Sequence, residues 1–191
     1  MRKVTIFMIP LTMFVVLSIF LYKGLYSDPR QLDSSLINQP LPPFSLPDLM
    51  QPEVTHTPDV FKGDVTLMNV WGVWCVTCAV ELPYLTQLRE EQGVRIVGLY
   101  YDQDTDPDFG IKSIPTIQKE VEVKLGQLGN PYAFNIFDVK RDYSLDLGVT
   151  GAPETFLIDK QGVVRMHHIG DINPRVWNNK IAPLYNQLVA E

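Results

Sequence analysis

The chain has 191 residues and a formal net charge of −6 at pH 7, from 16 basic and 22 acidic side chains. Because this balance provides no basic field that would attract nucleic acid or anionic lipid, we expect no nucleic-acid partner. Residues 44–191 are enough for one domain with its own hydrophobic core.

An uncharged segment near the N-terminus is the first predicted element. Residues 4–22 are mostly large apolar side chains, and their number is about what a helix needs to cross a bilayer. A cleavable signal peptide is the alternative, but the run is long for one and residues 23–29 offer no small-x-small cleavage site. Arg2 and Lys3 should stay in the cytoplasm. We therefore expect residues 1–23 to be a single-pass anchor, with the remaining chain outside the inner face.

The next segment has the composition of a linker. Residues 24–43 contain four prolines among polar residues and show no sustained apolar period, which is typical of a connecting segment. A domain over residues 44–191 should follow. It is predicted to open with a short strand at 44–49 and a short helix that starts at Thr57 and ends by Gly63.

The only two cysteines lie between a predicted strand and a predicted helix. Residues 65–70 form a compact apolar run of β type, and residues 79–92 have a helical pattern. At such a junction, unpaired N–H groups and the helix dipole stabilise negative charge, so Cys75 should ionise more readily than a free cysteine. A thiolate is the attacking species in disulfide exchange. Cys78, one turn later, should be less exposed and able to resolve a mixed disulfide at Cys75.

Three other interpretations of the cysteine pair are less favoured. A structural zinc site needs four ligands, and the chain has no second cysteine pair and only His56, His167 and His168 as histidines. A purely structural disulfide would close too small a loop to constrain the unfolded chain much. Covalent haem attachment needs a histidine where Ala79 stands. We therefore predict redox chemistry with neither a metal nor a cofactor.

A second apolar β-type run at 94–100 completes a strand, helix and strand. This succession predicts a right-handed crossover with parallel pairing, which brings residues 101–116 out beside Cys75. The segment alternates acidic residues as a calcium loop does, at Asp102, Asp104, Asp106 and Asp108. The match fails at Pro107, where such a loop needs glycine, and at Ser113, where it needs glutamate. We favour a solvated loop, and contact with a partner protein is a hypothesis.

The remaining elements follow at short intervals. The pattern predicts a helix over 116–128, strands over 133–137, 154–158 and 163–169, and a closing amphipathic helix over 175–189. His167 and His168 alternate on the last strand, so one should face inward and the other outward. We assign neither of them a catalytic part.

Three blocks of sequence carry a resemblance to a known family. Trp74 to Cys78, Pro83 and Gly151 to Thr155 together resemble a thioredoxin-like α/β fold, with three layers around a central mixed sheet. More narrowly, the chain resembles the membrane-anchored thiol-disulfide proteins of cytochrome c maturation, the CcmG/DsbE family. That likeness rests on residues 148–159, 128–132 and 170–177, and it covers nearly the whole chain, including the anchor.

The resemblance implies a reductase on the periplasmic side of a bacterial inner membrane. Its family keeps the cysteine pair of apocytochrome c, or of a haem-ligation partner protein that carries it, reduced for haem attachment. A membrane electron donor of the DsbD/CcdA type recharges the protein. Two alternatives stay open. One is a general periplasmic thiol oxidoreductase with other clients. The other is a copper-binding assembly protein that uses Cys75, Cys78 and a histidine.

The resemblance also implies roles for individual residues. Carried over by position, Cys75 is the nucleophile and Cys78 is the resolving thiol. Pro153 is a cis proline that faces the pair. Thr150 and Ala152 offer their backbone to an extended substrate as an added strand.

Two glutamates match the acidic residues of the family. Glu81 lies three residues beyond Cys78 on nearly the same helix face, and Glu154 follows the proline. A carboxylate near a thiolate disfavours the anion, which raises the thiol pKa and makes the couple more reducing. The alternative is that both are plain surface charges.

Two further residues near the cysteine pair are noted. Asn69 stands where ordinary thioredoxins bury an aspartate. Trp74 is expected to shield the neighbouring thiol and contact substrate.

Overall fold

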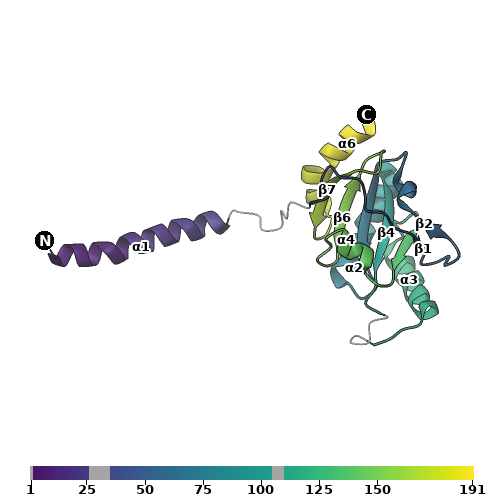
Figure 1. Ribbon diagram of the computed structural model, residues 1–191, viewed down its shortest axis with the longest axis horizontal. Coiled ribbons are helices and arrows are strands. Elements are labelled where there is room, and N and C mark those ends of the chain that lie inside the picture. Colours follow the sequence, from purple (N-terminus) through teal and green to yellow (C-terminus); the bar gives the residue numbers. More distant parts are fainter. Residues whose placement is uncertain (1, 26–34, 105–109) are drawn as a thin grey trace. The chain divides into compact units, whose positions relative to one another are not determined.

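The computed structural model describes residues 2–25, 35–104 and 110–191 (Figure 1). The chain divides into two units, Met1–Leu32 and Asp33–Glu191. Helix α1 (Arg2–Leu25) belongs to the first unit. In the described part of the chain, no helix is both long and apolar enough to cross a membrane. The anchor predicted from the sequence stays a prediction.

A mixed five-stranded sheet in the order β5-β4-β3-β6-β7 forms the centre of the second unit (Figure 1). Its strands are β3 (Thr66–Trp71), β4 (Arg95–Tyr101), β5 (Asn135–Asp138), β6 (Glu154–Ile158) and β7 (Val164–Ile169). Strands β3, β4 and β5 pair in parallel, whereas β6 is antiparallel to β3 and to β7. The predicted parallel crossover and the mixed sheet are therefore confirmed. Because β3 and β4 are parallel, the residues that follow them emerge at one sheet edge.

Helices and two short strands complete the unit. They are β1 (Leu46–Pro47), β2 (Thr55–His56), the 3₁₀ helix η1 (Pro58–Phe61), α2 (Val76–Gln92), α3 (Ile114–Leu128), α4 (Asp142–Asp146), α5 (Pro174–Val176), the π-helical turn η2 (Trp177–Ile181) and α6 (Ala182–Ala190). Helix α4 was not predicted. The closing helix contains a π-helical turn just before Pro183, which has no N–H to donate to the preceding turn. Strand β1 is shorter than predicted, because Asp48 accepts the backbone N–H groups of Met50 and Gln51 in a turn.

Side chains that alternate along β3 enter two separate cores. Leu67 and Trp71 pack with buried residues of α2, α3 and the C-terminal helices. Met68 and Val70 pack on the other face, with buried residues of η1, α4 and β7. The sheet is thus the middle of three layers.

The second unit includes residues that precede the predicted domain start at residue 44. The backbone N–H of Asn38 donates to the Val164 carbonyl over 2.7 Å, and the N–H of Val164 donates to the Gln39 carbonyl over 2.9 Å. Leu41 is buried in the second core. The later part of the predicted linker, residues 24–43, therefore lies along β7, while residues 26–34 are outside the described residues.

Candidate active site

The two cysteines lie where β3 passes into α2. Cys75 has extended backbone at the N-cap of α2, and its sulfur accepts the backbone N–H of Cys78 over 3.0 Å. The two sulfurs form a disulfide, with the Cα atoms 5.3 Å apart. Cys75 is 4% exposed and Cys78 is 0% exposed, so an incoming partner can reach only the first. The helix N-terminus also supplies the donors that stabilise a thiolate there.

The loop before β6 faces the cysteine pair. Its Ala152–Pro153 peptide bond is cis, as predicted, and the Ala152 carbonyl oxygen lies 3.5 Å from the Cys75 sulfur. Pro153 is buried, whereas Thr150 is exposed and Gly151 and Ala152 are half-buried. Backbone groups beside the reactive sulfur are thus open to a partner.

Glu154 holds this loop. Its Oε1 atom accepts three hydrogen bonds, from the Thr150 N–H (2.9 Å), the Thr150 hydroxyl (2.6 Å) and the Gly151 N–H (2.9 Å). Its Oε2 atom lies 2.7 Å from Nε2 of His167. Burial raises the pKa of Glu154, but the hydrogen bonds from His167 and Thr150 outweigh burial and leave that pKa below its usual range.

Glu81 is a buried acid on α2, one turn beyond Cys78, and it is 2% exposed. Its two oxygens accept the Asn69 side-chain amide (2.9 Å) and the Ile172 backbone N–H (2.8 Å). Burial raises the pKa of Glu81 to about 7, although these hydrogen bonds act in the opposite direction. Glu81 is therefore not a plain surface charge and can hold or release a proton near neutral pH.

The two glutamates lie on opposite faces of the sheet. Thr155 pairs with Asn69 across β3 and β6, and the Asn69 side-chain amide donates both to the Thr155 hydroxyl and to Glu81. The side chains of Thr155, Asn69 and Glu81 are therefore on the same face of the sheet. Side chains alternate along a strand, so Glu154 must point to the opposite face of the sheet, which is the face of Phe156 and the second core. The structure therefore does not bring both carboxylates to one side of the cysteine pair.

Tyr132 completes the surroundings of Glu81, a role that was not predicted although residues 128–132 are part of the family resemblance. Its hydroxyl donates to Asn69 Oδ1 over 2.7 Å, and its ring stacks on Trp71 with centroids 4.8 Å apart. Burial, and then the charge of Glu81, raise the pKa of Tyr132 well above its usual value, so the hydroxyl keeps its proton. The partners are far apart in sequence, so no local motif signals the contact.

Trp74 fixes the turn that carries Cys75. Its indole N–H donates to the Tyr101 carbonyl at the end of β4 over 3.0 Å, and the side chain is half-buried. A Cβ atom at Gly72 would collide with the indole, so glycine is needed for this close approach. The indole is thus fixed beside the turn, while shielding of the thiol and substrate contact by Trp74 stay predictions.

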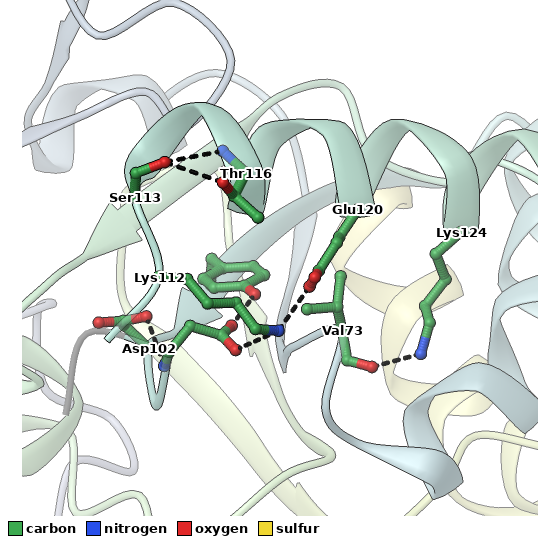
Figure 2. A network of polar contacts seen from close by, with 9 residues as sticks. Val73, Asp102, Lys112, Ser113, Thr116, Glu120 and Lys124 are labelled. Carbon is green, nitrogen blue, oxygen red and sulfur yellow. Dashed lines mark hydrogen bonds and ion pairs between the residues drawn. The ribbon is translucent and has the colours of Figure 1, made fainter. Parts of the chain in front are cut away.

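Figure 2 shows a second support, in which the chain after β4 is tied to α3. Asp104 is buried, accepts the Tyr100 hydroxyl (2.7 Å) and pairs with Lys112 (3.0 Å), which also contacts Glu120 on α3 (2.7 Å). Ser113 caps α3. These contacts replace the solvated loop that we expected for this part of the aspartate-rich segment. Its residues 105–109 lie outside the described residues.

The three histidines have other partners than the cysteines. They are paired as His56 with Asp48, His167 with Glu154, and His168 with the Asp171 carbonyl. Across the described ranges, no three His, Cys, Asp or Glu side chains are grouped to hold a metal ion.

Lys124 connects α3 to the active-site turn, because its ammonium group donates to the Val73 carbonyl (Figure 2). We expect Lys124→Met to slow alkylation of reduced Cys75 about threefold, since it removes a nearby cation and loosens the turn. Timed alkylation with iodoacetamide checks this. The matched control is Lys119→Met, which removes an exposed lysine from the same helix. An equal rate in both variants would contradict the prediction.

This arrangement suits one reaction, because a Cys75 thiolate can attack a disulfide and Cys78 can then release the product. The chain is accordingly a thiol-disulfide oxidoreductase with a thioredoxin-like fold. The Redoxin family model matches residues 36–188. Given this match and the relatives described next, the chain belongs to the DsbE (CcmG) family of thiol:disulfide interchange proteins.

Relatives match along almost the whole chain. The thiol:disulfide interchange protein DsbE of Pseudomonas aeruginosa is 43% identical over 190 residues, covering 99% of this chain and 97% of the relative. DsbE of Escherichia coli is 42% identical over 195 residues, with 99% and 98% covered. The crystal structure of a thio-disulfide isomerase from Thermus thermophilus matches with a TM-score of 0.55 and 22% identity, over 77% of this chain and 95% of that one. This last likeness concerns the fold alone.

Proposed function

We propose that this protein is a membrane-anchored periplasmic reductase of cytochrome c maturation. It keeps the cysteine pair of apocytochrome c, or of a haem-ligation partner that carries the pair, reduced for haem attachment. The observation that carries the proposal is the Cys75 sulfur, capped by a helix N-terminus and in contact with an accessible cis-proline loop. Relatives named DsbE, which match from end to end, support the choice of pathway.

The proposed anchor is the uncharged segment at residues 4–22. On α1, large apolar side chains from Met8 to Tyr22 are 46% to 73% exposed. Apolar side chains exposed in this way gain free energy when lipid replaces water around them. We therefore place α1 across the inner membrane and the second unit in the periplasm, where disulfide chemistry takes place.

The proposed reaction moves two electrons from this protein to its client. The Cys75 thiolate attacks one sulfur of the client disulfide, a Cys75–client disulfide forms, and the other client sulfur leaves as a thiolate that takes up a proton. Cys78 then loses its proton, for which Glu81 is the proposed acceptor, and attacks the Cys75 sulfur. The client leaves as a dithiol, and the protein is left with the Cys75–Cys78 disulfide that the structure contains. A membrane dithiol carrier of the DsbD/CcdA type restores the reduced form.

The proposed client site is the backbone of residues 150–152. These residues are at least partly accessible, and the Ala152 carbonyl contacts the reactive sulfur. An extended client segment can pair with them as an added strand, which brings its own disulfide to Cys75. Val76, which is exposed at the start of α2 and follows Cys75, is the proposed apolar contact for the client.

A Cys78→Ser variant of the full-length chain tests the proposal. Because the mixed disulfide at Cys75 cannot be resolved, we expect apocytochrome c or its haem-ligation partner to accumulate on the variant, as seen on non-reducing gels. The matched control is the double variant that also carries Cys75→Ser, which should trap nothing. Trapping of unrelated periplasmic proteins alone would favour a general oxidoreductase and reject the assignment to cytochrome c maturation.

A further inference from the structure

His167 on β7 is a buried side chain to which the sequence assigned no part in the reaction. The side chains of His167 and Glu154 are 3% and 1% exposed, and the two are joined over 2.7 Å. The imidazole stacks on Phe156, with centroids 4.1 Å apart and planes at 12°. Its Nδ1 atom is buried and has no hydrogen-bond partner among the described residues. The ring therefore has one polar partner in the described structure, which is the Glu154 carboxylate.

The two oxygens of Glu154 have separate tasks. Oε2 meets His167, while Oε1 accepts all three donors of the loop, from Thr150 and Gly151. A carboxylate held on one oxygen by a packed ring presents its other oxygen in a fixed direction. The position of His167 thus determines where the Thr150 and Gly151 N–H groups are held.

We propose that His167 is a positioning residue for client binding, because it holds Glu154 so that the backbone of residues 150–152 keeps the shape with which an extended client segment pairs. The inference rests on the proposed function, in which this backbone is the client site. The contacts involved run from His167 on β7, through Glu154 on β6, to the loop beside Cys75.

The contact has different consequences for different substrates. Without the His167 donor, the Glu154 carboxylate can turn, the loop loses its fixed acceptor, and a client must order the loop on binding. The Cys75 thiolate keeps its stabilising donor, since the Cys78 N–H that caps the sulfur lies on α2, whereas the Ala152 carbonyl of the loop has no proton to donate to it. A small disulfide that does not pair with the loop should therefore react as before.

The experiment compares two substrates in the full-length protein solubilised in detergent. His167→Phe keeps a ring to stack on Phe156 and removes the donor. We expect KM for a synthetic peptide with an internal Cys-x-x-Cys disulfide to rise about tenfold, with little change in kcat. The rate with hydroxyethyl disulfide and the reduction potential should not change. The matched control is His168→Phe, at a neighbouring residue whose polar contact is the Asp171 carbonyl, and its KM should stay at the wild-type value.

A second variant separates hydrogen bonding from packing. His167→Gln keeps a donor and loses the ring, so it should retain a KM close to that of the wild type. Equal losses in His167→Phe and His167→Gln would overturn the inference, as would equal losses with the peptide and with hydroxyethyl disulfide. A wild-type protein that shows no preference for the peptide over hydroxyethyl disulfide would instead reject the loop as the client site, and the inference with it.

Discussion

Replacing Cys75 by serine is expected to abolish disulfide exchange, with a loss of at least about a thousandfold in the rate with any disulfide substrate. A serine hydroxyl does not ionise near neutral pH, so the helix N-terminus has no anion to stabilise at this position. Cys78 cannot substitute as the attacking thiol, because its side chain is 0% exposed. Stopped-flow measurement of the first exchange step with the peptide disulfide checks this.

Cys78→Ser is the matched control for this prediction. It keeps the Cys75 nucleophile and the backbone N–H that caps it, so the first exchange step should continue and only release of the client should fail. The two cysteines then have distinct effects, one on attack and one on resolution. Comparable first-step rates in Cys75→Ser and wild type would contradict the assignment of Cys75 as the nucleophile.

Much of the fold and the cysteine site could be predicted because the signals are local. The cysteine pair and its flanking strand and helix depend on residues close together in sequence, and the structure confirms them. The cis proline was implied by the family resemblance, and the Ala152–Pro153 bond is cis. The parallel pairing of β3 and β4 follows from the crossover rule alone. Short elements such as α4 were missed, because five residues carry too little periodicity to mark a helix.

The surroundings of the site depend on contacts that no local pattern reports. Tyr132 reaches Asn69 from 63 residues away, and His167 reaches Glu154 from the neighbouring strand. One signal was available for Glu154, however. Phe156 and Ile158 are apolar residues at alternate positions after it, so the strand period places Glu154 on their face and away from the face of Thr155. Strand alternation, applied to the acid itself, would have separated the two glutamates.

Glu81 links the chemistry of the site to the stability of the fold. Its pKa is about 7 in the folded protein and 4.5 in an exposed chain. Between these values the folded state binds a proton that the unfolded state has lost, so stability falls as pH rises through this window. The difference corresponds to a loss of about 3 kcal/mol by the time both states are ionised.

Glu81→Gln should remove this pH dependence. The expected result is a gain of up to about 3 kcal/mol over wild type at about pH 8 and little difference at about pH 5. A glutamine fits the site if the Asn69 amide turns over, because the Thr155 and Tyr132 hydroxyls can each exchange donor and acceptor roles. Urea unfolding of the oxidised protein at the two pH values measures the effect. Glu90→Gln, an exposed position on the same helix, is the matched control.

The same substitution should slow the second step of the reaction. If Glu81 takes the proton from Cys78, a glutamine leaves that thiol without a buried base, and resolution of the mixed disulfide should fall about a hundredfold while the first step stays near wild type. A preformed mixed disulfide at Cys75, followed by quenched flow, isolates this step. Unchanged resolution together with the expected gain in stability would show that Glu81 is a buried acid of the fold that takes no part in proton transfer. A loss of resolution with unchanged stability would instead place the pKa of Glu81 near that of an exposed carboxyl.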